Sequence, residues 1–324
     1  MTTFTCNVQT PGSIQCIMSA VNNSKFQAAL FLVTGIPGQE DIHLWISIPF
    51  CLMYVISILG NSVILFIIKT DPNLHEPMYM FLSMLAITDL GLSLSTMPTT
   101  LGIFWEISHD ACFAQLFFIH FFTLTESSVL LSMAFDRFLA ICNPLRYDSI
   151  LTPPRIAKMG LVCLLRGVSL ILPFPILLKE HQYCQASILT HSYCLHQEVM
   201  KMACSDIRVN IIYGFFLTLF TNGFDLLLIL LSYLMILKTV LSIASHRERL
   251  KALNTCVSHV CIVLLFYTPE FSLSVIYRFV RSPSPLLEIV MGNVYLLAPP
   301  LMNPIVYSVK TKPIRTRIIR VFIK

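Results

Sequence analysis

Seven long apolar stretches, each able to cross a lipid bilayer as a helix, dominate this sequence of 324 residues. A helix needs about 20 mostly apolar residues to span the hydrocarbon core. The sequence therefore predicts an all-α membrane protein, a bundle of seven transmembrane helices. The expected spans are 45–68, 78–104, 112–133, 159–178, 211–237, 252–279 and 289–309.

Charge and composition support a membrane class and set the orientation. Only 12% of residues are charged and 56% are apolar, whereas a soluble domain carries about 25% charged residues. Of the Lys and Arg residues, 15 fall in segments on one side of the expected bundle and six on the other. Because basic loops stay in the cytoplasm, the N-terminus is predicted to lie outside. The net charge of +5 thus reflects the basic residues of the inner loops, and no nucleic-acid partner is expected.

The whole chain, 1–324, is interpreted as one membrane domain. It comprises an outer segment 1–44, a long outer loop 179–208 and a tail 310–324. Segment 1–44 lacks a basic region followed by an apolar core, so the first span is expected to act as an uncleaved anchor. Asn22 opens an Asn-Asn-Ser glycosylation acceptor on the outer side. The basic, amphipathic tail is expected to lie on anionic lipids of the inner leaflet.

The eleven cysteines divide by side of the membrane. Five lie within spans or face the cytosol, where thiols stay reduced: Cys51, Cys142, Cys163, Cys256 and Cys261. Four lie on the outer side and allow three pairings: Cys112, Cys184, Cys194 and Cys204. Cys6 and Cys16 are not assigned a partner. No Cys-x-x-Cys spacing occurs, so no structural metal is expected.

Six motifs, in order and at matching depths, give the chain a specific resemblance. They are 60–61 (GN), 74–82 (LHEPMYMFL), 133–147 (MAFDRFLAICNPLRY), 232–233 (SY), 251–259 (KALNTCVSH) and 300–307 (PLMNPIVY). Over residues 22–324 the sequence resembles the rhodopsin-like G-protein-coupled receptors and, within them, the olfactory receptors. The absent Trp in the fourth span, the absent Pro in the fifth and the stretch 266–269 (FYTP) match that branch. The stretch 34–38 (TGIPG) and the loop with three cysteines resemble its aquatic-type class I subgroup.

The resemblance implies a function, partners and a location. It implies a multi-pass plasma-membrane receptor that binds a small-molecule odorant, couples to a stimulatory (Gs, olfactory-type) G protein and raises cAMP, without being an enzyme. It also implies disulfides that join Cys112 to Cys194 and Cys184 to Cys204.

By the same resemblance, an activation switch lies at the inner ends of the spans. Asp136 is expected to hold Arg137 in the resting receptor. When Arg137 is released, its cation is expected to become accessible to the G protein. Alternatively, Arg137 is a residue that snorkels at the membrane edge. Partner residues implied by the motifs are Tyr233, His259, Asn303, Pro304 and Tyr307. The two tyrosines could instead be interfacial aromatics, and His259 a packing residue.

The first five expected spans hold four charged residues. Asp89 and Glu126 are interpreted as a sodium or proton site, or alternatively as a protonated pair hydrogen-bonded to the seventh span. Sodium is therefore the only bound ion expected, and no other cofactor is. Arg166 and Asp225 are interpreted as structural residues that satisfy buried polar groups.

Candidate ligand-binding residues gather near the outer ends. Glu270, Ser274 and Arg278 recur every four residues and share a helix face, one turn beyond Tyr267. His120 lies two turns into the third span. His196 and Gln197 follow Cys194, and a disulfide there would pin them over the bundle.

The resemblance makes these residues an acid-binding pocket, with Arg278 gripping a carboxylate. Alternatively, Arg278 is a rim charge that pairs with Glu180, Glu198 or Asp206. Glu270 departs from the expected pattern, because it would repel a carboxylate but accept a hydrogen bond from a hydroxyl or pair with an amine. The ligand is expected to be polar-headed and apolar-tailed.

Two rival functions lack the sequence patterns that they require. A secondary transporter would show internal repeats and broken helices in matching halves, and an intramembrane enzyme would need a motif such as Gly-x-Ser-x-Gly; neither pattern occurs. A non-olfactory receptor for a lipid, amine or metabolite is the nearer alternative.

Overall fold

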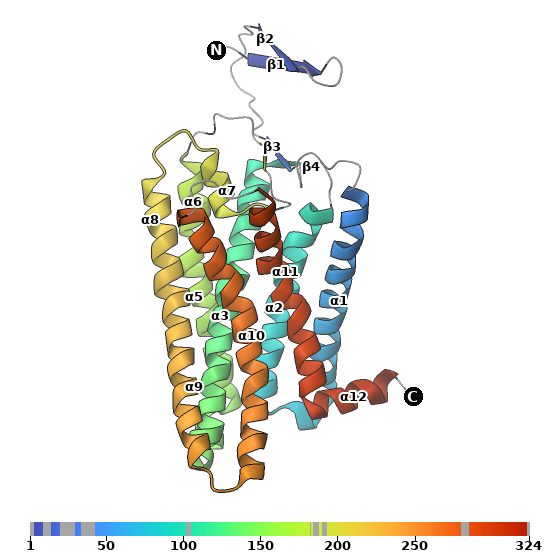
Figure 1. Cartoon of the computed structure of the whole chain (residues 1–324), viewed down its shortest axis with the longest axis vertical. Coiled ribbons are helices and arrows are strands. Elements are labelled where there is room, and N and C mark those ends of the chain that lie inside the picture. The colour runs from blue at the N-terminus through green and yellow to red at the C-terminus, as the bar shows by residue number, and fades with distance from the viewer. Residues whose placement is uncertain are drawn as a thin grey trace.

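A bundle of long helices forms the body of the molecule (Figure 1). The structure is a computed structural model that describes residues 3–8, 14–19, 30–33, 43–101, 105–181, 183, 188–189, 193–279 and 285–322. The helices of the bundle are α1 (His43–Thr70), α2 (Pro77–Leu101), α3 (His109–Cys142), α5 (Pro153–Ile171), α6 (Pro173–Lys179), α8 (Arg208–Leu217), α9 (Phe224–Ser242), α10 (His246–Phe279) and α11 (Pro285–Lys310).

Among the residues that the structure describes, six helical segments are long and apolar enough to cross a membrane: Ile48–Thr70, Pro77–Thr100, His109–Cys142, Pro153–Lys179, Arg208–Ser242 and His246–Ile276. The seventh is α11, which packs against α10, α1 and α2. The predicted all-α bundle of seven transmembrane helices is therefore confirmed. Several helices run past the expected spans; α3, for example, extends to Cys142 rather than 133.

The central helix of the bundle is α3. Two thirds of its apolar window is buried (67%), against 22% for the segment of α8 and α9. Large apolar side chains such as Leu59, Phe220 and Leu234 are more than half exposed and face outward. This arrangement is expected for a surface that contacts lipid rather than water.

Two of the seven helices are interrupted. The fourth breaks between α5 and α6 at Pro173, whose ring removes a backbone donor. The fifth passes from α8 through a π-helical turn, η4 (Thr218–Gly223), into α9. Such turns often mark functional sites. Both interruptions lie in the half of the bundle that carries the pocket described below.

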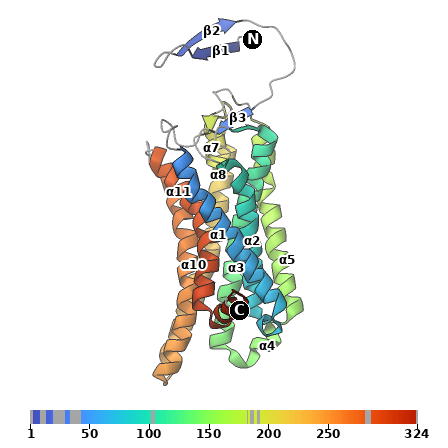
Figure 2. The ribbon, with the colours of Figure 1, turned by 90° about the vertical axis from the view of Figure 1, so that its right-hand side faces the viewer.

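Short strands at the outer end were not predicted from the sequence. β1 (Thr3–Val8) pairs antiparallel with β2 (Ile14–Ser19). β3 (Leu30–Val33) pairs antiparallel with β4 (Trp105–Ser108) and parallel with β5 (Ile188–Leu189). The N-terminal segment and two outer loops thus share one small sheet above the helices, near the short helix α7 (His196–Lys201) (Figure 2).

The inner end carries η2 (Pro72–Leu74), η3 (Pro144–Arg146), α4 (Tyr147–Ile150) and α12 (Lys312–Phe322). Helix α12 turns away from the bundle axis (Figure 1). Its Ile314 is fully buried, and its Arg317 lies 3.7 Å from Asp71 of the first inner loop. This geometry suits the predicted helix on the inner leaflet, which stays a prediction.

Candidate functional site

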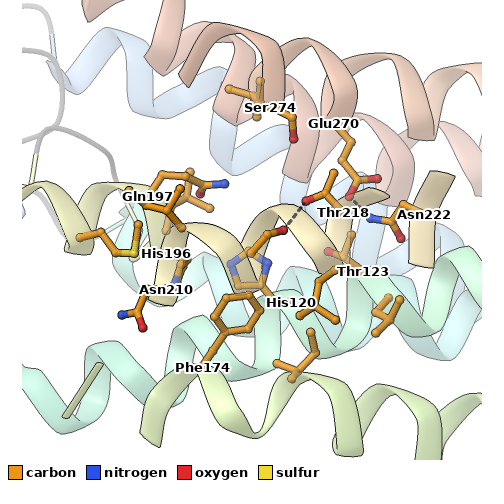
Figure 3. Close-up of a pocket in the computed structure, with 18 of the residues that line it drawn as sticks. His120, Thr123, Phe174, His196, Gln197, Asn210, Thr218, Asn222, Glu270 and Ser274 are labelled. Carbon is orange, nitrogen blue, oxygen red and sulfur yellow. Dashed lines mark hydrogen bonds between the residues drawn. The ribbon is translucent and has the colours of Figure 1, made fainter. Parts of the chain in front are cut away.

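A cavity of about 550 Å³ opens in the outer half of the bundle. Its walls come from α3, α5, α6, α8, η4, α10 and α11, and residues of α7 complete the lining (Figure 3). The volume lies within the range of about 300–1,000 Å³ typical of small-molecule pockets. Five predicted binding residues line it: His120, His196, Gln197, Glu270 and Ser274. Arg278 belongs to α10, but its side chain lies outside the described residues.

The π-helical turn shapes one wall of this cavity. Thr218, Thr221 and Asn222 all lie on η4 and line the pocket. Asn222 donates its side-chain amide to Glu270 Oε1 (Figure 3). Sequence reasoning missed these three residues, because a π turn changes which residues of a helix share a face.

Buried polar atoms of the pocket that have no hydrogen-bond partner within the described part of the chain include His120 Nε2, Asn210 Oδ1 and Glu270 Oε2. His120 packs against Phe174, with 5.6 Å between ring centroids. Apolar side chains, including Leu124, Ile171 and Leu217, complete the walls. The cavity therefore combines an apolar lining with a few polar groups that a ligand could satisfy.

The predicted disulfide between Cys112 and Cys194 is confirmed. The Cys194 amide also donates to Gln115 Oε1 (3.0 Å), and Gln115 in turn donates to Thr99 (2.7 Å). The start of α7 is thereby fixed to α3 and α2, which holds His196 and Gln197 over the pocket. Cys204 is disulfide-bonded. Cys184 lies outside the described residues, so its pairing with Cys204 stays a prediction, as does glycosylation of Asn22, which lies outside them too.

Directly inward from the pocket, Tyr267 enters a buried polar network. Its hydroxyl lies 2.7 Å from that of Ser127, which donates to Asp225 Oδ2 (2.9 Å). Arg166 donates to the same carboxylate oxygen (2.7 Å) and to Ser128 (2.8 Å). The network joins α3, α5, α9 and α10. Arg166 and Asp225, which were interpreted from the sequence as structural residues, pair with each other in this network.

Asp89 and Glu126 meet at a single amide. Asn303 Nδ2 lies 3.1 Å from both Asp89 oxygens and 3.2 Å from Glu126 Oε1. All three residues are at most 1% exposed. Glu126 Oε2 has no partner among the described residues. The contact with α11 matches the hydrogen-bonded pair considered above, and the open oxygen suits a cation or a proton. No cluster of three or more His, Cys, Asp or Glu suited to a metal occurs in the described ranges.

At the inner end, Arg137 is held by its neighbour. Arg137 Nη2 lies 2.6 Å from Asp136 Oδ2. Tyr147 donates to the other carboxylate oxygen at 2.7 Å, a contact that sequence reasoning missed. Burial, followed by the charge of Asp136, raises the pKa of Tyr147, which keeps its hydroxyl protonated as a donor.

The other residues of the predicted switch contact different partners. Tyr233 lies 2.6 Å from His259 Nδ1, and Tyr307 lies 3.8 Å from Met133 Sδ. Pro304 packs closely on Gly60, because a Cβ atom added at Gly60 would lie 2.9 Å from the Pro304 side chain. Arg137 thus pairs with Asp136 and not with either tyrosine, an arrangement that fits a resting receptor.

Residues 50–324 match the family model described as olfactory receptor. The chain belongs to the olfactory receptor family. It is 65% identical to human olfactory receptor 51G2 over 305 residues, covering 93% of this chain and 97% of that protein. It is 60% identical to human olfactory receptor 51A7, with the same coverage. These relatives place the receptor in family 51, within class I.

The fold has its counterpart in a solved receptor. The crystal structure of squid rhodopsin superimposes with a TM-score of 0.72, at 17% identity, covering 89% of this chain and 87% of that one. This olfactory receptor is therefore a multi-pass, rhodopsin-like membrane receptor. The family membership removes the enzyme and transporter alternatives.

Proposed function

We propose that the receptor binds a small polar-headed, apolar-tailed odorant in the outer cavity and, in response, opens its inner face to a stimulatory, olfactory-type G protein that raises cAMP. The observation that carries this proposal is the course of α10. One helix lines the cavity through Glu270 and Ser274, enters the polar network through Tyr267 and contacts α9 through His259. Glu270 and His259 are separated by about 16 Å along its axis.

The proposed mechanism begins at the pocket. A ligand that contacts Glu270 shifts α10 relative to η4, because Asn222 and Glu270 are bonded in the free receptor. The shift displaces Tyr267, which lies one turn further inward on α10, and so weakens the hydrogen bond between Tyr267 and Ser127. Pro269 lies between Glu270 and Tyr267 and removes one backbone hydrogen bond of α10, which makes this part of the helix easier to bend.

At the inner end, the same movement separates α10 from α9. Tyr233 then leaves His259, and Tyr233 and Tyr307 become free to turn toward Arg137. In this account Arg137 leaves Asp136 and presents its guanidinium to the G protein. A family member of this type also contacts membrane lipids, here through the basic residues of α12.

Asp89 and Glu126 are proposed to hold a sodium ion or a shared proton that stabilises the resting receptor. The residues fit a cation, since two buried carboxyl groups share one amide donor and Glu126 Oε2 has no partner among the described residues. A bound cation would neutralise the two carboxylates and keep α2, α3 and α11 together.

The experiment is an agonist screen in transfected cells with cAMP as the readout. Acids, alcohols, amines and steroids of matched size are applied to cells with and without the stimulatory G-protein α subunits. We expect at least one class to raise cAMP, and only in cells that contain those subunits. A cAMP response that persists without them would contradict the proposed coupling.

A further inference from the structure

The acidic residue in the pocket specifies the ligand's head group. We infer that the ligand carries an aliphatic ammonium group, which forms an ion pair with Glu270 and donates to His120, while its apolar tail fills the cavity. This inference rests on the proposed function and names the ligand class of the same pocket.

The Glu270 carboxyl group is buried in the wall of the cavity. Glu270 is 8% exposed and lines the cavity. Asn222 occupies Oε1, and Oε2 has no partner within the described ranges. A buried carboxylate without a cation is costly, so such a group either takes up a proton or pairs with a cation. The amide of Asn222 supplies a dipole but no charge, so a positive partner is missing from this contact.

Two basic residues lie on helices that line the pocket, Lys201 on α7 and Arg166 on α5. Lys201 lines the cavity, but its Nζ lies 2.7 Å from Glu198 Oε1. Arg166 lies 2.7 Å from Asp225. Both cations thus already have an acidic partner of their own. Arg278 lies two turns further out on α10, about 12 Å from Glu270 along the helix axis, and its side chain lies outside the described residues.

Another wall of the cavity carries the imidazole of His120. His120 lies on α3 and is packed against Phe174, and its Nε2 has no partner within the described part of the chain. A neutral imidazole has one nitrogen that accepts a hydrogen bond. An ammonium group has three donors, which suit Glu270 Oε2, this nitrogen and the hydroxyl oxygen of Thr218. That hydroxyl lines the cavity and already donates to Gly214.

A carboxylic acid fits the same position poorly. Its carboxylate would lie beside Glu270, and two buried carboxylates repel unless one takes a proton or a cation. An alcohol can donate one hydrogen bond to Glu270 but supplies no positive charge to an ionised carboxylate. The walls formed by Leu124, Ile171 and Leu217 favour an apolar tail.

The test compares three probes that differ only in the head group: 1-aminooctane, 1-octanol and octanoic acid. Concentration–response curves for cAMP are recorded for the wild type and for Glu270→Gln, Glu270→Asp and Arg278→Ala. Asp110→Asn is the control, because it removes a carboxylate that is 81% exposed and pairs with Lys179 outside the cavity. Surface immunostaining normalises every curve.

We expect the amine to be the most potent probe on the wild type. Glu270→Gln keeps the side-chain size but removes the charge, so it should weaken the amine at least about 30-fold, as expected when a buried charge pair loses one partner. Glu270→Asp should retain part of the amine response, which excludes a general folding defect. Glu270→Gln should weaken octanol much less than the amine, because the Gln amide oxygen still accepts a hydrogen bond from the hydroxyl, and Arg278→Ala should weaken the amine less than Glu270→Gln does. Asp110→Asn should leave the amine potency within about threefold of the wild type.

The opposite results overturn the inference. They are octanoic acid as the most potent probe, a potency of 1-aminooctane that Glu270→Gln leaves unchanged at matched surface level, or no response to the amine. These results do not bear on the proposed function, which has its own test. The proposed function holds if any odorant class raises cAMP through the stimulatory G protein, and it fails if none does.

Discussion

The Arg166 guanidinium on α5 donates to the Asp225 carboxylate on α9, with 2.7 Å between Nη1 and Oδ2. The same carboxylate oxygen accepts the Ser127 hydroxyl, which also contacts Tyr267. A charge pair within the hydrocarbon region is therefore bonded directly to the residue that lies one turn inward from the pocket. Because each member satisfies the others, the network should act as a unit.

The first prediction concerns this pair. Asp225→Asn and Arg166→Gln should each lower the amount of folded receptor at the cell surface, because removal of one partner of a buried pair costs about 3–5 kcal/mol. The double replacement Arg166→Met with Asp225→Leu should recover more surface receptor than either single variant, since no charge is left unpaired. Flow cytometry on an N-terminal epitope measures this. Single variants at the wild-type level would show that the pair contributes nothing to folding.

The second prediction concerns the disulfide. Cys112→Ser and Cys194→Ser should each abolish export, and the double variant should be no worse than either one, because removing a native disulfide costs about 2–5 kcal/mol once. Cys261→Ser is the matched control, since that thiol is free and exposed. If the double variant loses more surface receptor than either single variant, loss of the Cys112–Cys194 disulfide is not the cause of the export defect.

The third prediction concerns the resting state. Tyr147→Phe removes the hydrogen bond to Asp136, and a hydrogen bond to a charged group contributes about 1.5–3 kcal/mol. Asp136 should then hold Arg137 less well, and basal cAMP should rise severalfold at equal surface expression. Tyr54→Phe, which loses a tyrosine hydrogen bond to Thr100 at the other end of the bundle, serves as control. Equal basal cAMP in both variants would contradict the role of Tyr147.

The fourth prediction concerns the two carboxyl groups bridged by Asn303. Raising sodium at constant ionic strength should lower agonist potency in permeabilised membranes, if a cation stabilises the resting receptor. Glu126→Gln keeps the shape of the side chain but removes its charge, and it should abolish this dependence. Choline replaces sodium as the control for ionic strength. An identical sodium dependence in wild type and variant would assign the effect to another site.

Much of the fold was predictable because its determinants are local. Each span is a continuous apolar stretch, and the basic loops orient it, so seven helices follow without knowledge of contacts between them. The pairing of Cys112 with Cys194 came instead from the resemblance, since spacing alone left three alternatives open.

Other features depend on contacts between segments far apart in the chain. The small outer sheet is one example, because the strand Leu30–Val33 joins strands from two different outer loops, and such short strands carry no clear pattern of their own. The bond between Arg166 and Asp225 joins residues on different helices, so their depths alone did not reveal it. The π turn at Thr218–Gly223 places Asn222 beside Glu270, a contact that a regular helical period does not predict.

The most direct test of the account is agonist-evoked cAMP in Arg137→Ala. Arg137 pairs with Asp136 in this structure and is proposed to reach the G protein only after α10 moves. The variant should appear at the surface at the wild-type level, bind the agonist and give no evoked cAMP. Full evoked cAMP from Arg137→Ala, at matched surface expression, would contradict the proposed switch.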